Sequence, residues 1–259
     1  NKTQGRISLL EAYTISGTYT LPSKGIIYGD NVKAEFTVRS MTTDEEMKRL
    51  NPTDKPYKAM AEIIDACMVD KPGISAYDMC LGDYQFCLHK LRIVTYGSKY
   101  KLSTICPYCG TENSDTVDLS QLKVLEYSKD VEKYAEVTLP ATGKKVTLMM
   151  QTPRTLDEIA AQTKESAKKS NGQKESAFLL NLTSMVDKVD GERLDFMQLQ
   201  AFVRHLPMAD TNMLAAYGDK LNGSIGLDTR LDNTCEVCGL DYTSNFRTTA
   251  EFFRPTIDI

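Results

Sequence analysis

Strand patterns and helix patterns alternate through the first third of the chain. Apolar residues occupy every second position of the segment 32–38, which predicts a β-strand. The next segment, TTDEEMKRLN at 42–51, begins with two threonines that can cap a helix whose first turn is acidic. Residues 75–97 carry the strongest helix pattern of this region, and Gly97 is placed to end that helix.

A hairpin pattern and a long helical stretch follow. Valine and leucine alternate within 134–150 on both sides of a Thr142-Gly143 turn, which predicts a β-hairpin. Residues 155–227 then show helical spacing in about four segments, which indicates a small helical bundle. One of its apolar stripes continues to Val189, and Asp210 is placed to cap the last of these helices.

Two Cys-x-x-Cys-Gly motifs, CPYCG at 106–110 and CEVCG at 235–239, stand out among seven cysteines. This spacing lets one tight turn direct both sulfurs at one ion, and the glycine permits the positive φ that such a turn requires. Two such turns supply the four thiolates of a closed structural zinc site. The predicted ligands of one Zn²⁺ per chain are Cys106, Cys109, Cys235 and Cys238. The other cysteines lie among apolar residues and are expected to be buried: Cys67, Cys80 and Cys87.

Redox chemistry is the alternative use of Cys-Pro-Tyr-Cys. A redox dithiol should open a helix, whose N-terminus lowers the thiol pKa, but the segment TENSDTVDLS at 111–120 reads as a turn and a strand. The pattern therefore favours zinc. Because 125 residues separate Cys109 from Cys235, the ribbon is split, with a structural unit inserted between its halves. With no open ligand position, such a zinc ion should stabilise the fold and take no part in catalysis.

These patterns predict an α+β fold in four parts. Residues 1–30 form an extended N-terminal arm with short strands, and residues 31–105 combine a strand with a helical segment. A split zinc-ribbon and β-hairpin domain covers 106–154 and 228–259, and an inserted helical subdomain covers 155–227.

Composition limits the classes of function. The chain of 259 residues is 41% hydrophobic, which is enough to bury a substantial core, and its net charge of −4 is unlike a protein that grips nucleic-acid phosphates. No apolar stretch approaches the roughly 18 residues of a membrane helix. We recognise no signal peptide at Asn1 and expect a soluble protein made in a reducing compartment. Neither His89 nor His205 has an obvious nucleophile beside it, so no enzyme and no small-molecule substrate are expected.

Several segments occur in a distinctive order. LPSKGIIYG at 21–29 precedes FTVRSMTTDEEMKRL at 36–50, and LGDYQFCLHKLRIVTYG at 81–97 leads toward CPYCG, followed at a distance by CEVCG and a terminal Phe-Phe. This order resembles the baseplate hub and hub-assembly proteins of T-even-type contractile-tailed bacteriophages. The likeness is best over 21–119, and within the helical insert it rests on the order of elements alone.

The resemblance implies a structural component or assembly factor of the tail baseplate, in the hub region of the virion, assembled in the host cytoplasm. Its partners would be other baseplate and tail proteins, in multiple copies of a symmetric assembly, without membrane or nucleic acid. LPSKG would be a contact element, with an ordinary surface turn as the alternative. The terminal Phe-Phe either covers the ribbon or docks on a neighbouring chain. The candidate contact residues are Leu21, Pro22, Ser23, Lys24, Gly25, Tyr28, Phe252 and Phe253.

Two other classes remain as alternatives. A zinc-ribbon protein that binds nucleic acid or a transcription complex should present Lys, Arg and aromatic residues around its cysteines. Here PYCGTENSDTVD and EVCGLDYTSN present mostly acidic and neutral residues. A CPYC-type dithiol oxidoreductase would need a reactive Cys106 of low pKa.

Overall fold

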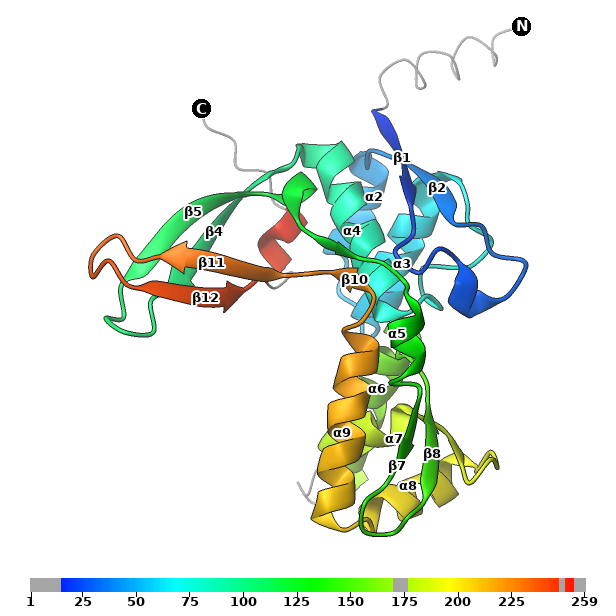
Figure 1. Ribbon diagram of the computed structural model, residues 1–259. Helices are drawn as coiled ribbons and strands as arrows, with labels where there is room; N and C mark the ends of the chain where they lie inside the picture. The colour runs from blue at the N-terminus through cyan, green and yellow to red at the C-terminus, as the bar shows by residue number, and fades with distance from the viewer. Residues whose placement is uncertain (1–14, 170–176, 247–249, 254–259) are drawn as a thin grey trace, which may run out of the picture.

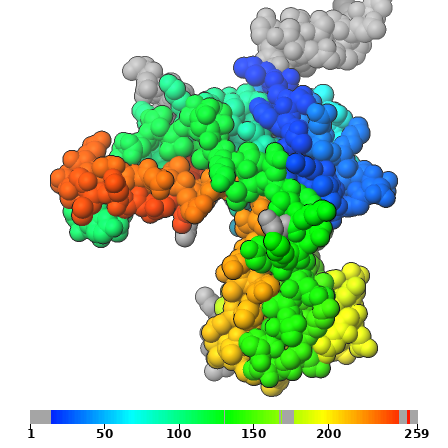
Figure 2. All heavy atoms as spheres, viewed as in Figure 1, coloured from blue at the N-terminus to red at the C-terminus, as the bar shows by residue number. Residues whose placement is uncertain are grey.

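The computed structural model describes residues 15–169, 177–246 and 250–253. The chain folds into a mixed α/β structure in which helices pack with several small antiparallel sheets (Figure 1). Figures 1 and 2 show a central body (residues 15–98 and 250–253), an insert lobe below it (129–222), and a cysteine arm that projects to the left (99–118 and 230–245).

The central body is built around one long helix, α4 (Leu81–Tyr96). Its buried residues lie on all sides of the helix, as in a core helix and unlike a surface helix. A three-stranded sheet of order β1-β2-β3 and further helices cover it. These other elements are β1 (Ser16–Thr20), the 3₁₀ helix η1 (Ile26–Tyr28), β2 (Glu35–Arg39), α2 (Thr43–Leu50), α3 (Pro56–Cys67), β3 (Met68–Asp70) and the 3₁₀ helix η3 (Ala250–Phe253).

Local predictions for the body are confirmed. Thr42 caps α2 in a capping box with Glu45, whose carboxylate accepts hydrogen bonds from the Thr42 backbone N–H (2.7 Å) and from Arg39 (2.8 Å). The hydrogen bond from Arg39 is the main reason that the pKa of Glu45 falls to about 2. The three cysteines expected in the core are buried, namely Cys67, Cys80 and Cys87.

Of the predicted N-terminal arm with short strands, the structure has the strand β1, but the described residues are packed on the body and form no separate arm. β1 pairs antiparallel with β2, and Leu21 and Ser23 are 1% and 0% exposed. The Ser23 backbone N–H and the Tyr28 hydroxyl donate to the two carboxylate oxygens of Asp83 at 3.0 and 2.7 Å. Gly25 has φ 74°, and a Cβ there would lie 2.8 Å from the Val32 carbonyl oxygen. LPSKG is therefore an internal turn packed on α4. Residues 1–14 of the expected arm lie outside the described residues.

The insert lobe contains a sheet as well as helices, so the prediction of a purely helical bundle is wrong. The helical stripe expected to reach Val189 ends at Ser184, and β9 pairs with β8 of the predicted hairpin. The Thr142-Gly143 turn is present, with Gly143 at φ 68°, but its hairpin pairs with the insert and not with the strands of the cysteine arm. The lobe comprises α5 (Lys129–Glu132), β7 (Glu136–Thr138), β8 (Lys145–Leu148), α6 (Pro153–Lys169), α7 (Ala177–Ser184), β9 (Val186–Val189), α8 (Phe196–Arg204) and α9 (Met208–Asn222).

Asp210 connects α9 to the hairpin instead of capping the helix. α9 begins at Met208 after Pro207, which leaves Asp210 inside the first turn. Its carboxylate accepts hydrogen bonds from the backbone N–H groups of Ala141 (2.7 Å) and Thr142 (3.0 Å). Asp195, by contrast, caps α8 through a capping box with Gln198. A short polar side chain near the start of a helix can thus accept hydrogen bonds from a distant turn instead of from the backbone of its own helix.

A two-stranded neck joins the insert lobe to the body. The chain enters through β6 (Val124–Leu125), after the 3₁₀ helix η2 (Leu119–Gln121), and returns through β10 (Gly226–Leu227), which pairs with β6. Gly82 at the start of α4 contacts this neck, since a Cβ there would lie 2.0 Å from the Ile225 carbonyl oxygen. The described helices include none that is long and apolar enough to cross a membrane.

Candidate metal centre on the cysteine arm

The cysteine arm consists of two β-hairpins that come from distant parts of the chain. β4 (Lys99–Ile105) pairs with β5 (Glu112–Asp118), and β11 (Arg230–Thr234) pairs with β12 (Asp241–Asn245). Each hairpin turn carries one Cys-x-x-Cys pair. In Figure 1 the hairpins lie side by side and their turns point away from the body.

The two turns share the same backbone hydrogen bonds and a left-handed glycine. In the first, the Cys106 N–H donates to the Thr111 carbonyl oxygen at 2.9 Å and the Gly110 N–H donates to the Cys106 carbonyl oxygen at 2.9 Å. In the second, the N–H of Cys235 donates to Leu240 at 3.0 Å and that of Gly239 donates to Cys235 at 2.9 Å. Both glycines are left-handed, with φ 75° at Gly110 and 72° at Gly239, as the sequence predicted. The repeated motif therefore gives a repeated sulfur-presenting turn.

The four predicted sulfur atoms converge. The Sγ atoms of Cys106, Cys109, Cys235 and Cys238 all lie within 4.8 Å of one another. Across the hairpins, Sγ of Cys106 is 3.8 Å from that of Cys238, and Sγ of Cys109 is 3.6 Å from that of Cys235. Tetrahedral bonds of about 2.3 Å to zinc place sulfurs about 3.8 Å apart, whereas a disulfide needs about 2 Å. The two distances across the hairpins match a four-thiolate metal site, which the four cysteines could form with small shifts of their side chains.

The pKa values of the cysteine thiols are also consistent with a site that binds a cation. The Cys238 backbone N–H is the main cause that lowers the pKa of Cys235 to about 6, and Thr111 lowers the pKa of Cys109. For Cys238, a backbone hydrogen bond from Leu240 favours the thiolate, but desolvation and the neighbouring thiols outweigh it and raise the pKa to about 12. Thiolates that lie this close repel one another, so all four thiols can lose their protons together only when a cation is bound.

Asn113 and Tyr242 tie the two hairpins together beside the sulfurs. Asn113 is 3% exposed, accepts a hydrogen bond from the Glu236 backbone N–H at 3.1 Å and donates one to the Tyr242 hydroxyl at 3.1 Å. The Tyr242 hydroxyl lies 2.7 Å from Oγ1 of Thr104, and Nδ2 of Asn113 lies 3.8 Å from Sγ of Cys235. Sequence reasoning missed both residues. Their roles depend on contacts between the two hairpins, which no local sequence pattern encodes.

The residues proposed for partner contact have other environments. Phe252 and Phe253 are 0% and 4% exposed, and the Phe252 ring lies 4.8 Å from the His89 ring. Nε of Arg92 donates to the Phe252 carbonyl oxygen at 3.1 Å. Both phenylalanines thus fill the chain's own core beside α4, which leaves neither free to dock on a neighbour. Residues 254–259 of the tail lie outside the described residues.

The first candidate contact segment is also used within the chain. Pro22 and Gly25 are buried with Leu21 and Ser23, and Tyr28 is partly buried. Lys24 is exposed, and its Nζ pairs with Glu126 at 2.7 Å. The contact role predicted for LPSKG is therefore wrong for its buried members, because these residues already lie within the chain's own interior.

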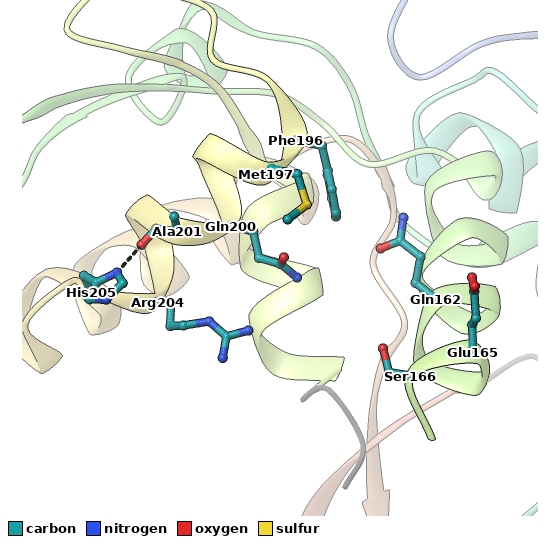
Figure 3. Close-up of a pocket in the computed structure, with 9 residues that line it drawn as sticks. All are labelled: Gln162, Glu165, Ser166, Phe196, Met197, Gln200, Ala201, Arg204 and His205. Carbon is teal, nitrogen blue, oxygen red and sulfur yellow. Dashed lines mark hydrogen bonds between the residues drawn. The ribbon is translucent and has the colours of Figure 1, made fainter. Parts of the chain in front are cut away.

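Hollows outside the cysteine arm include one in the insert lobe and one in the central body. A cleft of about 550 Å³ separates α6 from α8; Figure 3 shows Gln200 and Arg204 extending from α8 toward Gln162, while the His205 ring contacts the Ala201 carbonyl oxygen of its own helix at 2.7 Å. A second hollow of about 600 Å³ lies beside His89. Burial lowers the pKa of His89 to about 4, which keeps its imidazole neutral at physiological pH.

Comparison with known proteins gives one match. A family model described as T4 bacteriophage base plate protein matches residues 13–254, which include the body, the insert lobe and both cysteine pairs. Comparison with curated proteins and with solved structures found no match. Because the family model covers most of the chain, this protein belongs to the T4 bacteriophage base plate protein family.

Proposed function

We propose that this chain is a subunit or assembly factor of the hub region of the baseplate, acting through protein–protein contacts, with one structural Zn²⁺ bound by its four arm cysteines. The family match supports a structural role in the baseplate and a place in the virion tail. The observation that carries the metal proposal is the convergence of four sulfur atoms within 4.8 Å, on two turns from distant parts of the sequence.

The zinc would hold the two hairpins together. Cys106 and Cys235 are each 1% exposed and would form the inner side of the site, whereas Cys109 and Cys238 are exposed. When bound, Zn²⁺ supplies four bonds to thiolates and keeps no open position for a substrate. The chain's own Asn113 and the turn N–H groups would orient the sulfurs, as outer hydrogen bonds do in other metal sites.

The proposed role is non-catalytic. His89 is 2% exposed, and its Nδ1 contacts the Gln85 carbonyl oxygen at 2.7 Å; His205 likewise contacts its own helix backbone. Both cysteine pairs lie on hairpin turns, and neither opens a helix as a redox dithiol should. The acidic surroundings of the cysteines oppose nucleic-acid binding. We therefore favour other baseplate and tail proteins as partners, present in multiple copies after assembly in the host cytoplasm.

Quantitative mass spectrometry of purified mature baseplates and of hub assembly intermediates tests this role. A subunit should be present in both samples at a fixed ratio to other hub proteins, whereas an assembly factor should be present in the intermediates alone. Absence of the chain from both samples would contradict the proposed function.

A further inference from the structure

The turns of the cysteine arm expose apolar side chains. Ile105 and Val237 are each 71% exposed, Tyr108 is 63% exposed and Leu240 is 49% exposed. Tyr108 and Val237 occupy the same position in the two motifs, immediately before the second cysteine. We name these four side chains the apolar tip. Figures 1 and 2 show the turns that carry them at the far end of the arm, away from the body and the insert lobe.

Acidic residues surround the apolar tip. The distal segments 103–116 and 232–243 contain no lysine or arginine. Their five acidic residues are all exposed: Glu112, Asp115, Asp232, Glu236 and Asp241. A site of four thiolates also keeps a negative charge after it binds a divalent cation. The apolar tip therefore lies in a field of one sign, which selects for a positively charged partner.

The apolar tip is held in a fixed conformation before any partner binds. Strand pairing continues to Ile105 and Glu112 in one hairpin and to Thr234 and Asp241 in the other. Asn113 crosses between the hairpins just behind the turns, through its hydrogen bonds to Glu236 and Tyr242. A surface that is already ordered loses less conformational entropy on binding than a flexible loop does.

We propose that the apolar tip docks into a basic protein face, namely an apolar depression flanked by lysine or arginine side chains on another baseplate protein. The docking proposal rests on the proposed function in placing the partner within the baseplate. The chemistry of the partner is inferred from the exposed apolar side chains and the acidic residues of the tip. A symmetric contact between the tips of two copies is disfavoured because it would bring their acidic residues together. Nucleic acid is disfavoured because its phosphates carry the same sign of charge.

Photo-crosslinking in the infected host tests the docking surface. The full chain, with Tyr108 replaced by p-benzoylphenylalanine, complements a phage that lacks it, and the baseplates are irradiated and analysed by mass spectrometry. We expect a cross-linked peptide from another baseplate protein, with lysine or arginine beside the attachment point. The control replaces Met208, which is 65% exposed in the insert lobe, and should not yield this peptide. Cross-links from Tyr108 to a second copy or to nucleic acid, or none at all, would overturn the proposal.

The partner protein that cross-linking identifies is then purified, and its affinity for this chain is measured to test which side chains form the contact. Tyr108→Ala and Val237→Ala should each raise Kd about tenfold, as expected for central apolar anchors. The double variant Glu112→Lys with Glu236→Lys should also weaken binding, and the wild-type affinity should fall as salt increases. Met208→Ala is the matched control. Unchanged affinity in the tip variants, or affinity that rises with salt, would contradict docking through this surface.

The same samples separate this proposal from the proposed function. All substituted side chains are exposed, so zinc content and thermal unfolding should match the wild type. A zinc-containing chain found in baseplates without a Tyr108 cross-link would overturn the docking surface alone. A metal-free chain that still cross-links to a basic face would overturn the zinc proposal and leave the docking surface supported.

Discussion

The cysteine arm and the central body are both assembled from distant parts of the chain, but different interactions hold them together. In the body, β2, α4 and η3 meet through fully buried side chains such as Phe36, Leu91 and Phe252. Among the described residues of the arm, the buried hydrophobic cluster between the hairpins consists of Cys106, Cys235 and Tyr242. The difference suggests two ways to stabilise parts of one chain: the body is stabilised by apolar burial, and under the proposed function the arm is stabilised by zinc bound to its four cysteines.

The largest expected effect is on the arm, from loss of one metal ligand. Cys235→Ser should remove one of four thiolate bonds and with it a large share of the zinc-binding free energy, which totals about 10–16 kcal/mol for structural zinc sites. Competition with a chelating indicator measures this affinity. Cys80→Ser is the matched control, because Cys80 lies outside the cluster at the N-cap of α4, where serine is well tolerated. Tight zinc binding by the Cys235 variant would refute the four-thiolate site.

The second prediction concerns a substitution that should destabilise the body and leave the arm unchanged. Phe252→Ala should lower the free energy of unfolding of the body by about 3–5 kcal/mol, because it leaves a cavity among His89, Tyr100 and Phe246. Urea unfolding measures the change, and zinc content should stay at the wild-type value. Phe178→Ala is the control, since Phe178 is 54% exposed. Equal effects of the two substitutions would show that Phe252 is not a core residue.

The third prediction concerns pH and also belongs to the body. Burial lowers the pKa of His89 from 6.5 to about 4, so the unfolded chain binds this proton first as the pH falls. The stability of the body is therefore retained above pH 6.5 and decreases toward pH 4, by about 3 kcal/mol. Hydrogen exchange of α4 amides across this range measures it. His89→Phe should flatten the profile, and identical profiles in both proteins would contradict the buried neutral imidazole.

The smallest effect is expected from the polar link between the hairpins. Asn113→Ala removes the acceptor of the Glu236 N–H and a donor to Tyr242, and should weaken zinc binding about tenfold. The stability of the body should not change. Asn233→Ala is the control, because Asn233 is a partly buried asparagine in the same arm that bonds within its own hairpin. If Asn233→Ala weakened zinc binding as much as Asn113→Ala does, the link that Asn113 makes between the hairpins would have no specific role in zinc binding.

Features encoded by neighbouring residues were predictable from the sequence. The spacing within each Cys-x-x-Cys-Gly motif determines the turn that presents its sulfurs, and the two motifs together indicated the cluster. The caps of α2 and α8 and the turn at Gly143 were equally local, because each depends on residues within one turn of chain.

Features decided by distant partners were not predictable. The Ser23 N–H meets Asp83 sixty positions later, and no pattern in LPSKG encodes that contact. The four residues of β9 fit a helical stripe as well as a strand, and pairing with β8 decides between them. Whether Phe252 is buried or contacts another chain was ambiguous for the same reason. Its burial depends on α4, where Arg92, which bonds to Phe252, lies 160 positions earlier in the sequence.

Hydrogen exchange of zinc-loaded and chelator-treated protein, with metal content measured on the same samples, tests most directly whether a metal holds the arm. We predict about one zinc per chain, protected amides in residues 99–118 and 230–245, and loss of that protection after chelation while α4 stays protected. A metal-free protein whose arm amides remain protected would contradict the account.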